Sequence, residues 1–174
     1  MAGSIEDNAA IYKKLYTYVP PTPPADLVDS TSFTIDFAGR KFIHVGVDPT
    51  CDSTTNVLII TPARHIVVTA DFLRSMFNMT RHILSYLFDA PKYKRIIFLS
   101  TETTTLSNMA YKGGNVLVIE SKTQDGCRVI LSRDDLMRLL DLEEHIIKAV
   151  TRKAVKTHSK DSISCEVSVT YPII

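Results

Sequence analysis

Two segments of the chain repeat the same order of residue types. Residues 67–84 and 130–147 align without a gap at an offset of 63, and the runs 56–60 and 115–119 match at an offset of 59. The pairs in step are Thr69/Ser132, Asp71/Asp134, Leu73/Leu136, Met76/Leu139, Phe77/Leu140, Asn78/Asp141, Met79/Leu142, His82/His145 and Ile83/Ile146. A unit of about sixty residues is too long for the common solenoid repeats, and two copies are too few for a solenoid. The pattern therefore predicts a tandem duplication and a pseudo-twofold pair of small domains.

Composition and charge restrict the class of protein. The chain has 174 residues, 45% of them hydrophobic and 22% charged, which is enough for one compact domain or two closely packed halves. A net charge of +1 is far from the strongly basic balance of many nucleic-acid binders, so an anion-binding surface requires local segregation of charge. The three cysteines show no metal-ligand spacing and are interpreted as reduced thiols of an intracellular protein. No basic leader or long apolar run is present, so we expect neither secretion nor membrane insertion.

The two ends of the chain differ from its centre. Residues 1–31 contain the run Val19-Pro-Pro-Thr-Pro-Pro-Ala25, which favours a stiff, extended arm. Residues 152–174 begin with a basic cluster, which either complements the end of a helix or contacts phosphate, two interpretations of equal weight. The alternation of apolar and polar residues from Ile163 to Ile174 is typical of an edge strand.

Between these ends, the hydrophobic pattern predicts the same elements twice. Period-two runs indicate strands, and apolar residues three or four apart indicate helices that begin after the N-cap residues Thr69 and Ser132. We expect strands over 33–37, 42–45, 57–60 and 66–68 before a helix over 70–87, and strands over 95–99, 106–109, 116–120 and 128–131 before a helix over 133–151. The predicted fold class is α+β, with ββββα repeats over 32–88 and 89–151. The antiparallel sheets would be joined by helices at the seam of an intramolecular pseudo-dimer.

Several motifs carry a resemblance to a known family. Phe33–Ile35 followed by Gly39–Val45 resembles the opening hairpin of the positive cofactor four family of transcriptional coactivators. Tyr111–Val118 is similar to the aromatic-Lys-Gly turn that enters the third strand of that family. The runs 64–73 and 128–136 resemble its basic residue, apolar strand, Ser/Thr cap and first helical turn. The resemblance covers about residues 32–150 and is a match of patterns, without a long identical stretch.

The resemblance implies a function and a set of contact residues. Members of the family bind single-stranded DNA with a unit of four strands and a helix, and two chains pair through their helices. This chain resembles that dimer written as one polypeptide, acting in transcription or replication, in the nucleus or at a site of nucleic-acid replication, in a cell or a virus. Stacking aromatics interleaved with cations suit single strands, DNA or RNA. The expected contacts are Arg40, Lys41, Phe42, Arg64, His65, Lys92, Lys94, Arg95, Tyr111, Lys112, Lys122 and Arg128.

Departures from the family pattern keep an alternative open. The turn over 52–55 in the first repeat has neither the aromatic residue nor the Lys, and the strands near 101–105 in the second repeat lack the basic pair. A scaffold for transcription or replication proteins, with nucleic-acid binding lost and further self-association allowed, is therefore the second hypothesis. No phosphate loop or hydrolytic motif is present, so we expect no enzyme activity and no cofactor. His82 and His145 lack further ligands, and no metal site is predicted.

Overall fold

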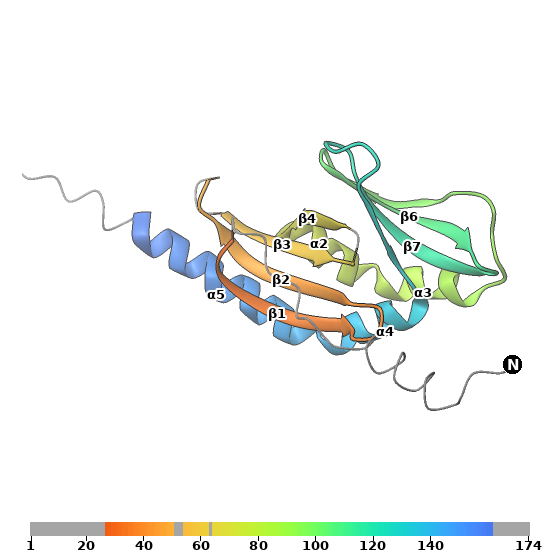
Figure 1. Cartoon of the computed structure of the whole chain (residues 1–174), viewed down its shortest axis with the longest axis horizontal. Helices are drawn as coiled ribbons and strands as arrows, with labels where there is room; N and C mark the ends of the chain where they lie inside the picture. The colour runs from red at the N-terminus through yellow and green to blue at the C-terminus, as the bar shows by residue number, and fades with distance from the viewer. Residues whose placement is uncertain (1–26, 51–53, 63, 162–174) are drawn as a thin grey trace, which may run out of the picture.

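The computed structural model describes residues 27–50, 54–62 and 64–161 (Figure 1). The Pro-rich run of the arm and the edge strand expected over 163–174 lie outside these residues. The described chain forms two antiparallel four-stranded sheets, each followed by helices, so the α+β class is confirmed.

Sheet A has the order β1-β2-β3-β4, which is also the order along the chain. Its strands are β1 (Val28–Asp36), β2 (Lys41–Asp48), β3 (Thr54–Ile60) and β4 (His65–Thr69). The strand β1 begins four residues before the expected start of the first repeat. Alternate residues of β2 and β3, such as Ile43 and Val57, are buried in the hydrophobic core, as the period-two pattern requires.

Sheet B repeats this order as β5-β6-β7-β8. Its strands are β5 (Ile97–Ser100), β6 (Thr104–Tyr111), β7 (Gly114–Ser121) and β8 (Arg128–Leu131). The loop between β7 and β8 is longer than the loop between β3 and β4. The sequence alignment of the two segments also needs additional residues at this connection. The additional residues are therefore accommodated in a surface connection, which tolerates them at little cost.

Each predicted helix is broken in two, which corrects the expectation of single helices over 70–87 and 133–151. The structure has α2 (Ala70–Asn78), α3 (Thr80–Phe88), α4 (Arg133–Asp141) and α5 (Glu143–Asp161). The breaks fall at Met79 and Leu142, which are paired positions of the repeat. Both residues have a ψ near zero, and their amides donate to several carbonyls of the preceding turn. An apolar pattern of period 3.6 continues through such a break, so the pattern alone does not reveal it.

The last helix is longer than the sequence pattern indicates. It continues to Asp161, ten residues past the expected end at Thr151. The segment Arg152–Val155 consists of good or moderate helix formers, and residues 152–161 contain neither Gly nor Pro. The basic cluster expected after the helix is therefore part of it.

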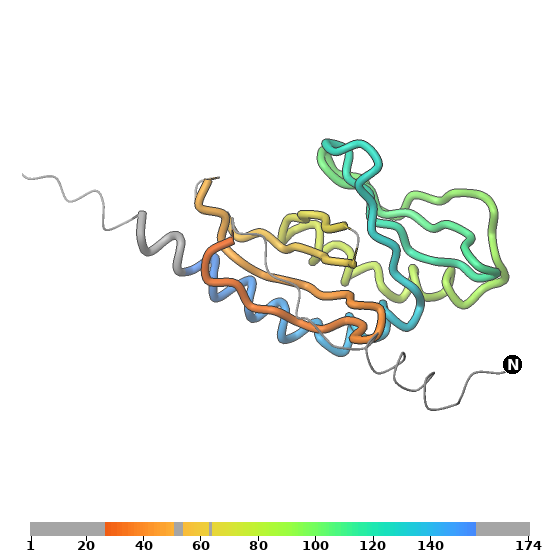
Figure 2. Tube along the Cα trace, viewed as in Figure 1, coloured from red at the N-terminus to blue at the C-terminus, as the bar shows by residue number. Residues whose placement is uncertain are grey.

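The two halves exchange their final helices (Figure 2). Helix α3 packs against β7 of sheet B, whereas α5 packs against β2 and β3 of sheet A. Ile83 and Leu87 of α3 and Ile146 and Val150 of α5 are buried in these contacts. Each sheet thus has its inner face covered by a helix from the other half, and neither half has a closed core of its own.

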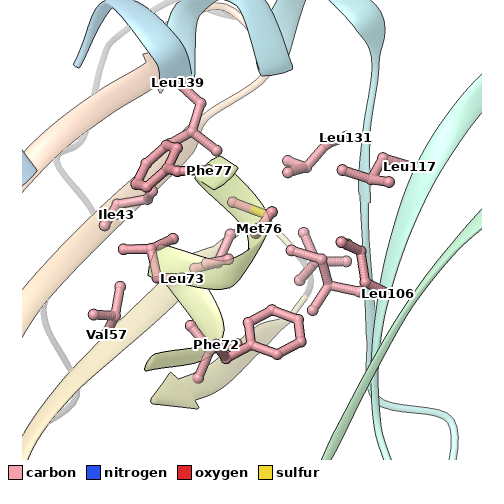
Figure 3. Close-up of a cluster of buried hydrophobic side chains, with 14 of the residues drawn as sticks. Ile43, Val57, Phe72, Leu73, Met76, Phe77, Leu106, Leu117, Leu131 and Leu139 are labelled. Atoms are coloured by element: carbon pink, nitrogen blue, oxygen red, sulfur yellow. The ribbon is translucent and has the colours of Figure 1, made fainter. Parts of the chain in front are cut away.

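Helix α2 lies at the centre of the core between the two sheets (Figure 3). Its residues Leu73, Met76 and Phe77 are buried. Figure 3 shows Ile43 and Val57 of sheet A on one side of this helix and Leu106, Leu117 and Leu131 of sheet B on the other. One continuous hydrophobic core therefore joins both sheets.

Candidate nucleic-acid interface

Sheet B has one face in the core and one face directed outward. Leu106, Leu117, Ile119, Val129 and Leu131 belong to the core, and the alternate residues of the same strands point the other way. We call this second set the outer face of sheet B. By the strand pairing it comprises Thr105, Ser107, Met109 and Tyr111 on β6, Val116, Val118 and Glu120 on β7, and Arg128 and Ile130 on β8.

The segment that enters β5 lies against this outer face. Arg95 donates from Nε to Ser107 Oγ over 3.2 Å and from Nη2 to Glu120 Oε2 over 2.7 Å. A shallow cavity of about 110 Å³ remains between this segment and the strands. It is lined by Tyr93, Arg95, Ser107, Asn108, Met109, Val118, Glu120 and Arg128. This cavity combines an apolar floor with cations at its border.

The most exposed aromatic side chain of this site is Tyr93. It is 92% exposed, although it lies next to the cavity of the outer face. Arg128 is also exposed and stands opposite Glu120 in the strand pairing. Glu120 forms an ion pair with Arg95, and among the described residues no ion pair is found for Arg128. The exposed ring of Tyr93 and the guanidinium group of Arg128 line the same cavity.

The β6–β7 turn ends the outer face at its other side. Lys112 and Gly113 have φ angles of 49° and 80°, the left-handed pair that a two-residue hairpin requires. Tyr111 is 46% exposed, and the ammonium group of Lys112 lies 5.4 Å from the centre of its ring. Arg133 Cζ lies 5.0 Å from the centre of the ring of the exposed Phe88, and Arg133 also lines, with Tyr111 and Lys112, a cavity of about 260 Å³. The turn thus presents two aromatic rings with two cations.

A third group of cations lies near the β7–β8 loop. Arg64 donates to the carbonyl oxygen of Gly126, and Lys122 donates to Ser100 Oγ over 2.8 Å and to the carbonyl of Thr101. All three acceptors are neutral, so these hydrogen bonds position the two cations, and neither cation forms an ion pair among the described residues. The Sγ of Cys127 donates to the carbonyl of His65 over 3.1 Å. These contacts hold the start of β4 beside Arg128.

The first hairpin does not join this surface. Lys41 forms an ion pair with Asp135 of α4, and Phe42 is only 2% exposed. Arg40 is exposed at the β1–β2 turn, with a φ of 52°. A buried ring cannot stack on a base without rearrangement, and a cation held by a buried carboxylate is not available to phosphate. Of Arg40, Lys41 and Phe42, only Arg40 has the exposed side chain expected of a contact residue.

The remaining two expected residues flank the outer face. Lys92 donates to Asp89 Oδ2 over 2.7 Å and lies 4.5 Å from the centre of the Tyr86 ring. The hydrogen bond to Asp89 raises the pKa of Lys92. Lys94 is exposed. The structure therefore places Arg64, His65, Lys92, Lys94, Arg95, Tyr111, Lys112, Lys122 and Arg128 on or beside sheet B, and separates them from the first hairpin.

Three residues of this surface were not among the expected contacts. Tyr93 lies inside the basic segment 92–95, where aromatic and basic residues alternate, and this composition could have identified it. Phe88 and Arg133 lie 45 positions apart and meet only because α3 ends and α4 begins near the same turn. No local pattern in the sequence marks that pair.

The corresponding outer face of sheet A has a different chemistry. His44 is buried, and its Nε2 lies 3.1 Å from Ser32 Oγ. Within the part of the chain that the structure describes, Nδ1 of His44 has no hydrogen-bond partner. The buried side chains Phe42 and Leu58 lie on the same face, and Leu27 packs against Gly46. The two outer faces are therefore not equivalent: the face of sheet A buries Phe42, His44 and Leu58, whereas that of sheet B carries the exposed Tyr111 and Arg128 beside its apolar residues.

The buried imidazole predicts a pH dependence of stability. Burial lowers the pKa of His44 below its usual 6.5, so below that pH the unfolded chain takes up a proton that the folded protein does not. The free energy of unfolding is expected to fall as the pH decreases from about 7 through 6.5 to the lower pKa of the folded state. Each unit between the two pKa values corresponds to about 1.4 kcal/mol. Denaturant unfolding from pH 5 to 8 measures the slope.

The matched control for this prediction is the exposed His65. Replacing His65 with Gln is expected to leave the pH dependence unchanged, whereas replacing His44 with Gln is expected to flatten it. An equal slope in the wild type and in His44→Gln would contradict the assignment.

Comparisons and searches add the following facts. No protein-family model and no curated protein matches this chain. Within the described residues, no helix is long and apolar enough to cross a membrane. The same residues contain no group of three or more His, Cys, Asp or Glu side chains placed to hold a metal ion.

Proposed function

We propose that the chain is a non-enzymatic protein that binds single-stranded nucleic acid on the outer face of sheet B, in transcription or replication. The observation that carries this proposal is the exposed Tyr93 beside Arg95 and Arg128, continued at the β6–β7 turn by Tyr111 and Lys112. Single strands expose base faces and phosphates, and rings interleaved with cations match both.

The dimensions of the outer face support a short binding site. The eight residues of β6 extend over about 26 Å at roughly 3.3 Å per residue. A single strand of about four nucleotides would occupy that length, and this number is the lower end of the site sizes of OB-fold domains that bind single strands. Tyr111 lies at one end of this path and Lys122 near the other.

The grouping of cations on one part of the surface would allow a nearly neutral protein to bind nucleic acid. The net charge is only +1, so nonspecific attraction by the whole molecule is weak. The cations Arg64, Lys122 and Arg128 are nevertheless grouped at one end of sheet B, and none of them forms an ion pair with a described acidic residue. We therefore expect binding to depend on salt with a modest slope, in proportion to a few phosphate contacts.

We also propose that the fold is a tandem pseudo-dimer of the kind that the sequence resemblance implies. Three features support this: equivalent N-caps at Thr69 and Ser132, helix breaks at the paired Met79 and Leu142, and the exchange of final helices between sheets. An exchange of this type is what two identical chains would form on pairing through their helices. The divergence of the outer faces then leaves sheet B as the binding half.

Fluorescence anisotropy with labelled single-stranded and duplex oligonucleotides tests the function. Tyr93→Ala and Arg128→Ala are each expected to weaken single-strand binding about tenfold, since stacking on a base is worth roughly 1 to 3 kcal/mol. Arg74→Ala is the matched control, because Arg74 lies on α2 and pairs with Asp71. The wild type is expected to prefer single strands and to bind less tightly as salt rises.

The scaffold remains the second candidate function, favoured by the use of Lys41 and Phe42 inside the fold. If the wild type binds neither oligonucleotide at low salt, nucleic-acid binding is excluded and the scaffold is preferred. If Tyr93→Ala and Arg128→Ala bind as well as the wild type, the interface is not the outer face of sheet B.

A further inference from the structure

Another cavity lies on the other half of the molecule from the outer face of sheet B. A groove of about 940 Å³ runs between β1 and α5. It is lined by Asp29, Thr31, Phe33, His145, Ile147, Lys148, Ala149, Thr151, Arg152, Lys153 and Val155. None of these residues belongs to the proposed nucleic-acid interface.

The groove forms because α5 leaves one side of sheet A uncovered. Helix α5 packs mainly on β2 and β3, and β1 is the edge strand of the sheet. The side chains of Thr31 and Phe33 on β1 therefore form one wall, and the flank of α5 forms the other. A sheet edge beside a helix is the place where a further helix can pack as the next member of the same layer.

The α5 wall of the groove is a regular stripe. His145, Lys148, Arg152 and Val155 are exposed and follow one another at spacings of three and four residues, with Ala149 among them. From residue 145 to residue 155, ten steps of roughly 1.5 Å each, the stripe extends over about 15 Å along the helix. A partner helix of about three turns could lie along this stripe, with contacting side chains at the same spacing of three and four residues.

The groove has an apolar floor and a cationic border. Phe33 and Ile147 are partly buried, and Val155 is 63% exposed. The exposed Lys148 lies 2.5 Å from Glu144 on the same helix, whereas Arg152 has no ion-pair partner within the described residues. The acid in the lining, Asp29, lies 3.4 Å from the buried Nζ of Lys153. The surplus charge of the border is therefore positive.

From this arrangement we propose that the groove between β1 and α5 binds a short, acidic, amphipathic helix of a partner protein. Its apolar side chains would lie against Phe33, Ile147 and Val155, and its carboxylates would face Lys148 and Arg152. The chemistry disfavours other occupants. If two copies paired through this groove, His145, Lys148 and Arg152 of one copy would face the same residues of the other. The lysine and arginine charges would then repel one another. A nucleic-acid strand would find an aliphatic wall in place of exposed rings.

The test uses the full-length chain and a fluorescein-labelled peptide, three copies of Glu-Leu-Leu-Glu, which places its leucines on one face and its glutamates on the other when it is helical. Saturable binding is expected by anisotropy. Arg152→Glu and Lys148→Glu are each expected to weaken it at least tenfold, because both residues are exposed and their reversal turns attraction into repulsion. A peptide with Gln in place of Glu is expected to bind more weakly, and one with Lys is not expected to bind.

Controls distinguish the groove from the interface on sheet B. Arg133→Glu, on α4 at the β6–β7 turn, is expected to leave peptide binding unchanged. Circular dichroism of Arg152→Glu checks that the fold is retained. No saturable binding of the acidic peptide up to about 1 mM, or equal binding by Arg152→Glu and Lys148→Glu, overturns the proposal. A loss of oligonucleotide binding in these two variants, without loss of peptide binding, assigns the groove to nucleic acid and also overturns it.

Discussion

Replacing Asn115 with Ala is expected to lower the free energy of unfolding by about 3 kcal/mol. The amide of Asn115 is 94% buried and forms four hydrogen bonds to the backbone. Its Nδ2 donates to the carbonyls of Tyr86, Asp89 and Ala90, and its Oδ1 accepts from the amide of Lys92. The substitution removes these four hydrogen bonds, and each is worth roughly 0.5 to 1.5 kcal/mol.

Asn115 holds the end of α3 and the following linker against β7 of the other half. Carbonyls at a helix C-terminus need partners outside the helix, and here a single side chain supplies them. Loss of this contact is therefore expected to loosen the attachment of α3 to sheet B. Chemical denaturation measures the change in free energy, and hydrogen exchange locates it in residues 86–92.

The matched control is Asn56, which occupies the paired position in the first repeat. Its Nδ2 donates to Asp48 Oδ2 over 3.4 Å, a long hydrogen bond near the end of β2. Asn56→Ala is expected to cost less than 1 kcal/mol. Equal effects of the two substitutions would contradict the role assigned to Asn115.

Replacing Lys41 with Met is expected to lower the free energy of unfolding by about 3 kcal/mol without a loss of single-strand binding by sheet B. Lys41 pairs with Asp135, whose side chain is only 4% exposed. The same carboxylate accepts from the backbone amide of Ser132 over 2.7 Å and completes the capping box of α4. Removal of the cation leaves a buried, uncompensated carboxylate, which costs roughly 3 to 5 kcal/mol when burial is complete.

A double substitution separates charge from packing. Asp135→Asn keeps an oxygen for the amide of Ser132 and removes the negative charge, so it is expected to restore a large part of the stability lost in Lys41→Met. Lys112→Met is the control, because Lys112 is exposed at the β6–β7 turn, and it is expected to change stability by less than 0.5 kcal/mol. If Lys41→Met weakened oligonucleotide binding and left stability unchanged, Lys41 would be a contact residue.

Much of the fold follows from local patterns. Alternating runs such as Phe33–Ile35 and the N-caps at Thr69 and Ser132 indicated the strands and the helix starts, and the structure has both. The helix breaks at Met79 and Leu142 were not indicated, since neither residue is a Gly or Pro and the apolar spacing continues through them. Local propensity therefore indicates where a helix begins more clearly than where it breaks, since the breaks depend on packing.

The candidate site was predictable only in part. Motif matching found Tyr111, Lys112 and Arg128, which the structure places on or beside one sheet. It also selected Lys41 and Phe42, whose surroundings come from residues distant in sequence. Whether a Lys faces solvent or a buried Asp depends on what packs over its strand, and no short motif contains that information.

The class of fold, the double succession of strands and helices, and the residue types available for an anion-binding surface follow from periodicity and caps within a few residues. Long-range packing sets the contacts of α3 with sheet B and of α5 with sheet A, and it leaves Tyr111 and Arg128 exposed on one outer face while it buries Phe42 and His44 on the other. It also decided the use of Lys41 and Asn115 to join the halves. The physical reason is that burial and charge compensation depend on neighbours far away along the chain, as Lys41 and Asp135 illustrate.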